Sequence, residues 1–179
     1  MTAPVWHEEP ISRNHDRGRF DCGEPALNEY LRTHARQNHE RGAAKTFLAI
    51  NDLDAAIIGY YSLCPASVKY SDAPLSIRKG LARHDVPAFR LARLAVDLKF
   101  QGQNIGRELL IGAGLRCLRA ASQIGGVALL IDAKNDRVAR WYASFGALPL
   151  IDSPGSLLLP LETIAEVLRN SGRHPPLLH

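Results

Sequence analysis

Residues 93–107 read RLAVDLKFQGQNIGR. The apolar residues of 88–96 predict a strand, the polar segment 97–107 predicts a glycine-containing loop, and apolar residues on one face predict a helix from about 106 to 121. A strand that leads through a glycine loop into a helix is a recurring way to bind phosphate. The unpaired amides of the first helical turn point outward, and the helix dipole favours an anion.

The loop matches neither of two common nucleotide-binding motifs. Only three residues separate Gly102 from Gly106 and no Lys-Ser/Thr pair follows, which excludes a Walker A loop. No glycine stands two positions after Gly102, which excludes the G-x-G-x-x-G motif. Judged on the loop alone, an ordinary strand-to-helix turn that uses glycine for its geometry is the alternative to phosphate binding.

The remaining hydrophobic patterns predict an α/β chain. They indicate a helix at 25–41, strands at 45–50 and 55–63, a short helix at 76–83, a strand at 127–131, a helix at 135–145, a strand at 157–159 and a helix at 161–170. The first helix is amphipathic, and its expected inner face comprises Leu27, Tyr30, Leu31, His34 and Ala35. Gly42 and Gly146 are expected to end the helices before them.

Length and composition favour one globular domain. The chain has 179 residues, 46% of them hydrophobic and 22% charged, which excludes disordered and collagen-like classes. We expect one domain at 1–170 and a flexible tail at 171–179. The longest stretch without charged residues, 55–68, contains Pro65 and is shorter than the about 20 apolar residues of a membrane span. The N-terminal residues do not read as a secretory signal, so a cytoplasmic location is expected.

The cysteines and histidines indicate neither disulfides nor a metal site. Cys22, Cys64 and Cys117 are odd in number and widely spaced, and we expect them to be buried thiols. His34 and His39 are five residues apart, so they do not share a helix face as a zinc-binding pair would, and no Cys-x-x-Cys is present. No metal is therefore expected.

Positive charge is concentrated in the middle of the chain. The net charge is +4, but residues 78–140 contain twelve Lys or Arg against five Asp or Glu. This surplus suits an anionic partner such as a nucleotide or RNA. The alternative is a solvated basic face.

Three blocks of sequence together resemble the GNAT acetyltransferase superfamily. They are residues 93–97, 101–107 and 141–146. In that family a Q/R-x-x-G-x-G/A loop binds the pyrophosphate of acetyl-CoA. Gln101 and Gly106 fit its first and last positions, and Asn104 stands where the middle glycine is expected. Asn tolerates a positive φ better than other non-glycine residues, so the turn can form.

Further blocks resemble the GNAT toxins of bacterial toxin–antitoxin pairs. They are residues 20–31, 35–37, 41–47 and 59–63, and the resemblance extends from about Ile11 to Leu168. It implies an α/β (α+β) GNAT fold, with a mixed, mostly antiparallel central sheet splayed around acetyl-CoA and helices on both faces. It also implies a homodimer and a neutralising ribbon-helix-helix antitoxin.

The resemblance assigns a chemical role to each block. The backbone of Leu94, Ala95 and Val96 is expected to bind the pantetheine arm of acetyl-CoA. The pyrophosphate is expected to lie on Gln101, Gly102, Gln103, Asn104, Ile105, Gly106 and Arg107. Tyr142, four residues before Gly146, is the expected general acid for the departing thiolate. Without the resemblance, Tyr142 is more simply a packed aromatic beside Trp141 and Phe145.

In the toxin branch the acetylated amine belongs to an aminoacyl-tRNA, and its acetylation blocks translation. An α-amine has a pKa of about 8, so it needs no strong base, whereas a lysine amine at about 10.4 does. Candidate residues for the tRNA surface are Arg78, Lys79, Arg83, Arg90 and Arg93. The alternatives are a GNAT enzyme for a small-molecule or protein amine, and a CoA- or RNA-binding module in which Asn104 has disabled turnover.

Overall fold

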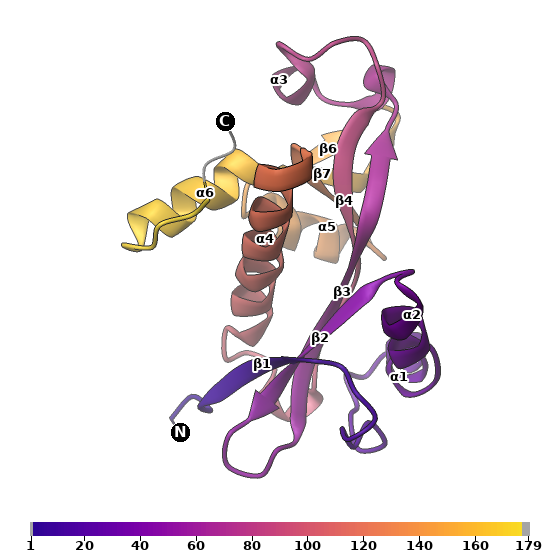
Figure 1. Cartoon of the computed structure of the whole chain (residues 1–179), viewed down its shortest axis with the longest axis vertical. Coiled ribbons are helices and arrows are strands. Elements are labelled where there is room, and N and C mark those ends of the chain that lie inside the picture. The colour runs from indigo at the N-terminus through magenta and orange to yellow at the C-terminus, as the bar shows by residue number, and fades with distance from the viewer. Residues whose placement is uncertain (1, 177–179) are drawn as a thin grey trace. The chain divides into compact units, whose positions relative to one another are not determined.

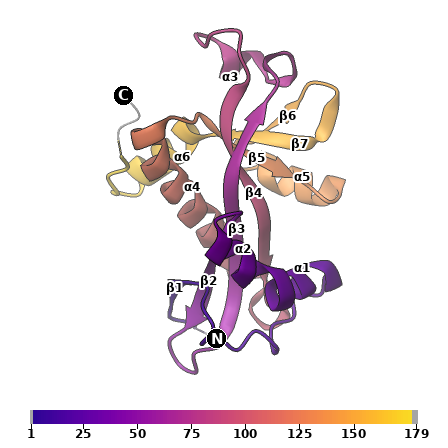
Figure 2. The same cartoon turned by 45° about the vertical axis from the view of Figure 1, so that its right-hand side comes forward.

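The computed structural model of the chain describes residues 2–176. Within that range, seven strands form one sheet in the order β1-β2-β3-β4-β5-β7-β6 (Figure 1, Figure 2). They are β1 (Trp6–Pro10), β2 (Lys45–Asn51), β3 (Ile57–Val68), β4 (Val86–Val96), β5 (Ala128–Asp132), β6 (Leu148–Leu150) and β7 (Ser153–Pro160). β4 and β5 pair in parallel, whereas β1–β2, β2–β3, β5–β7 and β6–β7 are antiparallel. The expected mixed, mostly antiparallel sheet is confirmed.

Helices occupy most of the predicted positions. They are α1 (Pro25–Glu29), the π-helix η1 (Tyr30–His34), α2 (Ala35–Arg41), α3 (Leu75–Arg78), α4 (Ile105–Ile124), α5 (Asp136–Ala143) and α6 (Leu161–Asn170). Two 3-10 turns are η2 (Tyr70–Asp72) and η3 (Leu98–Phe100). Gly42 adopts a positive φ of 77° directly after α2. Gly146 adopts a φ of 100°, but α5 ends at Ala143 and not at Phe145 as expected, so this glycine lies in the turn that follows the helix.

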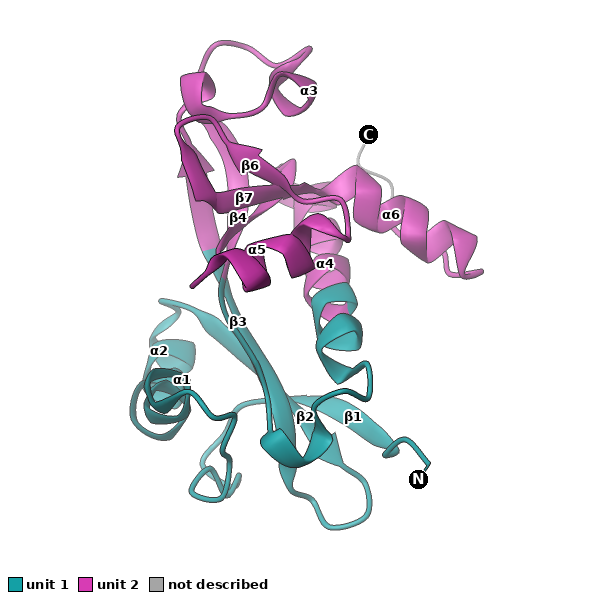
Figure 3. Cartoon of the chain, turned by 180° about the vertical axis from the view of Figure 1, so that it is seen from behind, with its two compact units in different colours: residues 1–64, 92–111 teal, residues 65–91, 112–179 magenta. Residues whose placement is uncertain are grey.

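The chain divides into two compact units, each made of two segments (Figure 3). Unit 1 comprises residues 1–64 and 92–111, and unit 2 comprises 65–91 and 112–179. The assignment of 1–170 to a single domain stays a prediction. Residues 171–173 donate backbone hydrogen bonds to the end of α6. Residues 177–179 of the expected flexible tail lie outside the described residues.

In unit 1 the helical segment 25–41 packs on one face of the β1–β2–β3 meander. Its buried residues Tyr30, Leu31 and Ala35 join a core with Leu48 and Tyr60. The π-helix explains this spacing. In it the N–H of Ala35 donates to the carbonyl of Tyr30, so residues five apart lie above each other.

The π-helix also corrects one expectation. His34 was expected on the inner face of a regular α-helix, but its side chain is exposed. Because the hydrogen-bond partners Tyr30 and Ala35 are five positions apart, Ala35 takes the inner position and His34 turns toward solvent.

Two strands, β1 and β6, were not predicted from the sequence. β1 reads WHEEP and lies at one end of the sheet order, while β6 is three residues long at the other end. Their polar or proline-containing sequences lack an apolar alternation, because edge strands need not be buried on both faces. The short helix expected at 76–83 is also shorter than predicted, since α3 ends at Arg78 just before Gly80.

Unit 2 has its own apolar core. Val86 and Ala88 of β4, Leu130 of β5 and Leu158 of β7 are among its buried residues. A Cβ on Gly114 of α4 would lie 2.6 Å from the Cδ1 of Ile164 in α6, so the two helices approach as closely as glycine allows. No helix of residues 2–176 is long and apolar enough to cross a membrane.

The cysteines depart from expectation at one position. Cys22 and Cys117 are buried, and burial raises the pKa of Cys117 to about 12 and that of Cys22 above its ordinary value. Cys64 is only half-buried, so the expectation of a buried thiol was wrong there. It lies within β3 at the point where unit 1 ends in the sequence.

Candidate functional site

The loop after β4 makes a turn that contains two residues in the left-handed region. Gly102 and Asn104 both adopt positive φ, at 79° and 64°, which confirms the expectation that Asn104 can replace a glycine in this turn. The first helical hydrogen bond of α4 runs from the Glu108 amide to the Asn104 carbonyl over 3.1 Å. The amides of residues 105–107 precede that bond and are therefore available to an anion.

Side chains from within and before the loop hold it in place. The buried carboxylate of Asp97 accepts hydrogen bonds from the Asp21 amide (3.1 Å) and the Lys99 amide (3.0 Å). The side-chain amide of Gln101 donates to the carbonyls of Cys22 (3.1 Å) and Val96 (2.9 Å). The side chain of Gln101 thus fastens the loop to Cys22 and Val96.

Asp21 and Cys22, the residues that these hydrogen bonds reach, lie just before α1. Asn28 accepts from the Cys22 amide (2.9 Å) and donates to the Asp21 carboxylate (2.8 Å). The Asp21 carboxylate also accepts from the Gly23 amide, and these hydrogen bonds lower its pKa. We call Asp21, Cys22, Asn28, Asp97 and Gln101 the loop network, because they join the residues before α1 to the loop after β4.

The end of β4 is closely packed in unit 1. Ala95 is buried in the core that contains Tyr30 and Tyr60, while Leu94 and Val96 are half-buried. A Cβ on Gly59 of β3 would lie 3.0 Å from the Ala95 carbonyl oxygen and 2.8 Å from the Cδ1 of Leu109. Glycine at 59 therefore permits this approach of backbone to backbone.

Tyr142 lies in unit 2, near the end of α5. The helix begins as expected at Asn135, whose side chain accepts a hydrogen bond from the Val138 amide over 2.9 Å. Tyr142 is 6% exposed, its ring packs edge-on against Trp141, and burial raises the pKa of its phenol. Among residues 2–176 no side-chain hydrogen bond engages its hydroxyl.

A curated relative identifies the family. The chain is 39% identical over 135 residues to the "tRNA-acetylating toxin" of Mycobacterium tuberculosis, and the aligned residues cover 75% of this chain and 80% of that protein. The chain belongs to the tRNA-acetylating toxins. No protein-family model matches it.

Solved structures show that these toxins share the GNAT fold with this chain. AtaT complexed with acetyl-methionyl-tRNAfMet is 28% identical, has a TM-score of 0.85 and aligns over 92% of this chain and 99% of AtaT. A mutant AtaT bound to the C-terminus of its antitoxin AtaR and to acetyl-CoA is 27% identical with a TM-score of 0.77, over 92% of this chain and 99% of that one.

The toxin's five candidate tRNA-binding residues are not equivalent. Arg90 pairs with Asp132. Arg78 donates to the Tyr70 carbonyl (3.2 Å) and lies over the Tyr70 ring. Lys79 and Arg83 are exposed, and within residues 2–176 neither makes an ion pair.

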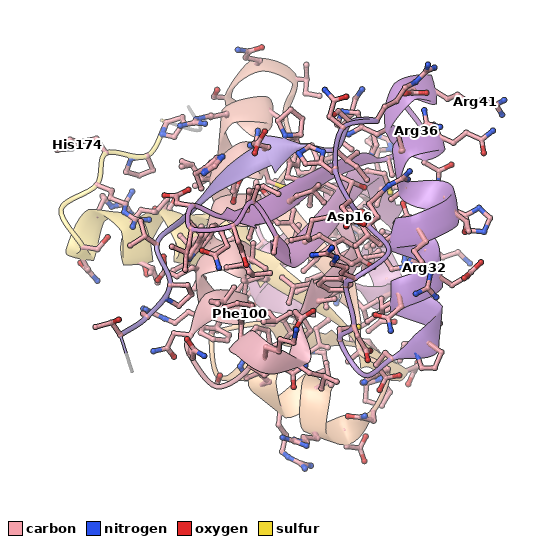
Figure 4. All side chains as sticks on the ribbon, turned by 90° about the horizontal axis from the view of Figure 1, so that it is seen from below. Asp16, Arg32, Arg36, Arg41, Phe100 and His174 are labelled. Carbon is pink, nitrogen blue, oxygen red and sulfur yellow. The ribbon has the colours of Figure 1, made fainter. Side chains whose placement is uncertain are left out.

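A second group of arginines lies outside the basic region that the sequence indicates. Arg32, Arg36 and Arg41 lie along the helical segment of unit 1, outside the basic region 78–140 (Figure 4). Two of them are matched by acids on the same segment, with Arg36 2.7 Å from Glu40 and Arg32 3.4 Å from Glu29. These pairs explain why the net charge of the segment is small.

Of the loop network, the sequence pointed only to Gln101 as a candidate site residue, and the hydrogen bonds of the other four were missed. Asp97 is the first residue after β4, and a buried carboxylate at that position needs partners, so its burial is the signal that identifies it. Phe100, labelled in Figure 4, marks the η3 turn that follows it. Among the described residues, no three His, Cys, Asp or Glu side chains gather as metal ligands.

Proposed function

We propose that this chain is a toxin that transfers the acetyl group of acetyl-CoA to the α-amino group of an aminoacyl-tRNA. The observation that supports this most directly is the loop after β4, where Asn104 reproduces a glycine-like turn at the first turn of α4. That turn occurs in a chain 39% identical to a tRNA-acetylating toxin. An acetylated α-amine cannot accept a peptide, so the product would halt translation.

The loop and the end of β4 would bind acetyl-CoA. The amides of Ile105, Gly106 and Arg107 are positioned for a phosphate, and the Arg107 side chain is exposed beside them. The backbone of residues 94–96 would hold the pantetheine arm. The structure of AtaT with acetyl-CoA supports this choice of co-substrate.

The reaction then needs little more than a proton donor. The neutral α-amine forms a bond to the thioester carbonyl carbon, and the carbon–sulfur bond breaks as the thiolate leaves. Tyr142 would donate its phenolic proton to that sulfur, whose thiol has a pKa of about 8.5. The proton released by the amine passes through water and restores the phenol of Tyr142. The raised pKa of Tyr142 keeps its proton in place until the thiolate leaves.

An antitoxin would neutralise the activity. AtaT bound to the C-terminus of AtaR supports a protein antitoxin for this chain as well. The ribbon-helix-helix class of that antitoxin, the homodimer and the cytoplasmic location stay predictions.

Acetylation of charged tRNA tests the proposal. The purified chain is incubated with labelled acetyl-CoA and charged total tRNA, with uncharged tRNA as the control, and mass spectrometry identifies the acetylated amino acid. Label on charged tRNA alone is the expected result. Acetyl-CoA binding without label on tRNA would instead point to a small-molecule or protein amine.

The Tyr142→Phe variant tests the general acid. It is expected to slow transfer about 10²- to 10⁴-fold with unchanged acetyl-CoA affinity, because only the proton donor is lost. Tyr70→Phe, also in unit 2, is the matched control and should leave the rate unaltered. Full activity of Tyr142→Phe would contradict the assigned role.

A further inference from the structure

Arg93 of β4 has an unusual environment in unit 1. Its guanidinium lies over the ring of Tyr30, with the central carbon 4.6 Å from the ring centroid. Its Nη1 donates a hydrogen bond to the neighbouring Ala92 carbonyl over 2.7 Å. The side chain is half-buried, yet no carboxylate pairs with it among residues 2–176.

A half-buried cation without a carboxylate partner is a preformed anion site. Removing a guanidinium from water is unfavourable unless an opposite charge or a ring face compensates it. Here the ring of Tyr30 is the compensating group, and most N–H donors of the guanidinium fork remain unused. A planar fork of this kind matches the oxygens of a phosphate in a bidentate manner.

The aromatic platform beneath Arg93 is rigid. Tyr30 begins the π-helix η1 and is 9% exposed. Its ring stacks on Tyr60, with centroids 6.5 Å apart, and Tyr60 is fixed by a 2.7 Å hydrogen bond to the Leu27 carbonyl and by the edge of Phe20. Arg93 therefore lies over a ring that cannot turn away.

The position of Arg93 on the strand indicates which phosphate it meets. Side chains two apart on a strand share a face, so Arg93 points to the same side as Ala95, which is the side of Tyr30 and the helical segment. Arg93 also directly precedes residues 94–96, which are proposed to hold the acetyl-bearing arm. A cation at this place lies beside the point where the acceptor amine must arrive.

We propose that Arg93, stacked on Tyr30, binds a backbone phosphate at the acceptor end of the aminoacyl-tRNA and thereby positions its α-amine. The inference rests on the proposed function and assigns one residue pair to the recognition of its substrate. A phosphate of acetyl-CoA is the other source of the same chemistry, and the experiment separates the two.

The test compares two acceptors that carry the same amino acid. One is charged tRNA, and the other is the aminoacyl-adenosine, which has the amine and terminal nucleoside but no phosphodiester. Arg93→Gln removes the charge, Arg93→Lys keeps it without the planar fork, and Arg119→Gln removes an exposed arginine of α4 as the control. Each variant is also titrated with acetyl-CoA, which reports the cofactor site, and its thermal unfolding is measured, which reports that the fold is intact.

For Arg93→Gln we expect KM for charged tRNA to rise about tenfold or more at nearly unchanged kcat, because a hydrogen-bonded charge pair is lost. KM for aminoacyl-adenosine and the Kd of acetyl-CoA should stay as in the native chain. For Arg93→Lys the KM for charged tRNA should lie between the values for the native chain and Arg93→Gln, since an ammonium meets a phosphate as a point charge only. Arg119→Gln should match the native chain.

Three results would overturn the inference. An unchanged KM for charged tRNA in Arg93→Gln would exclude a phosphate contact. An equal rise for aminoacyl-adenosine would show that Arg93 meets the amino acid or nucleoside, and a weaker acetyl-CoA Kd would assign it to the cofactor. If the native chain binds acetyl-CoA but labels no charged tRNA, the proposed function itself fails, and that result is read before any variant is compared.

Discussion

The left-handed conformation of Asn104 provides the sharpest test of the loop. At φ 64° a β-branched side chain clashes with its own backbone, so Asn104→Val should disfavour this conformation by about 1–2 kcal/mol. The turn must keep its shape for the amides of residues 105–107 to face an anion. That free energy corresponds to an about 5- to 30-fold weaker Kd for acetyl-CoA.

Isothermal titration with acetyl-CoA measures this change, and thermal unfolding reports the fold at the same time. Asn104→Gly is the matched control, because glycine adopts positive φ freely, and it should bind acetyl-CoA at least as tightly as the native chain. A Val variant that binds within about twofold of the native chain would refute the argument that this turn holds the pyrophosphate. Weaker binding in both variants would instead implicate the Asn104 side chain.

Three further outcomes follow from the packing and the charges. Gly59→Ala should destabilise the fold by about 1–3 kcal/mol in denaturant unfolding, because its Cβ would meet Leu109 and the Ala95 carbonyl. Gly155→Ala, whose Cβ would have only one atom nearby, at 3.9 Å, should be near neutral. Equal effects of the two substitutions would contradict the close approach at Gly59. Asp97→Asn should cost about 1.5–3 kcal/mol in the same assay, since one of the two carboxylate oxygens that accept from backbone amides becomes an NH2 donor; native stability would show that the network is dispensable. In a pH profile, kcat/KM for charged tRNA should rise about tenfold per unit up to about pH 8, as the α-amine loses its proton. It should then stay level, because the raised pKa keeps Tyr142 protonated; a decline that begins near pH 9 would contradict the general acid.

The sequence predicted well wherever the determinants are local. Gly42 caps the end of α2 and Gly146 lies in the turn after α5, where glycine adopts positive φ without strain, and the side chain of Asn135 caps the first turn of α5. The turn at Asn104 was predictable because Asn tolerates a positive φ better than other non-glycine residues. Short segments decide these features, so they do not depend on which part of the chain packs nearby.

The sequence was less informative where pairing decides the structure. β1 contains two glutamates and a histidine, and it is a strand because its backbone pairs with β2. Helical spacing predicted Tyr30 and Ala35 on the inner face but placed His34 there too, because the π-turn that directs His34 outward leaves no periodic signal in the sequence.

For this protein, then, sequence alone determined the strand, loop and helix of the proposed cofactor site, the candidate Tyr142 and the family. Only the tertiary structure decided how individual side chains are used. Gln101 binds Cys22, 79 residues away, and Asp97 binds Asp21, 76 residues away. Arg93 lies over Tyr30. Hydrogen bonds and ring contacts between such distant residues depend on the packed backbone, which brings together groups that no local pattern relates.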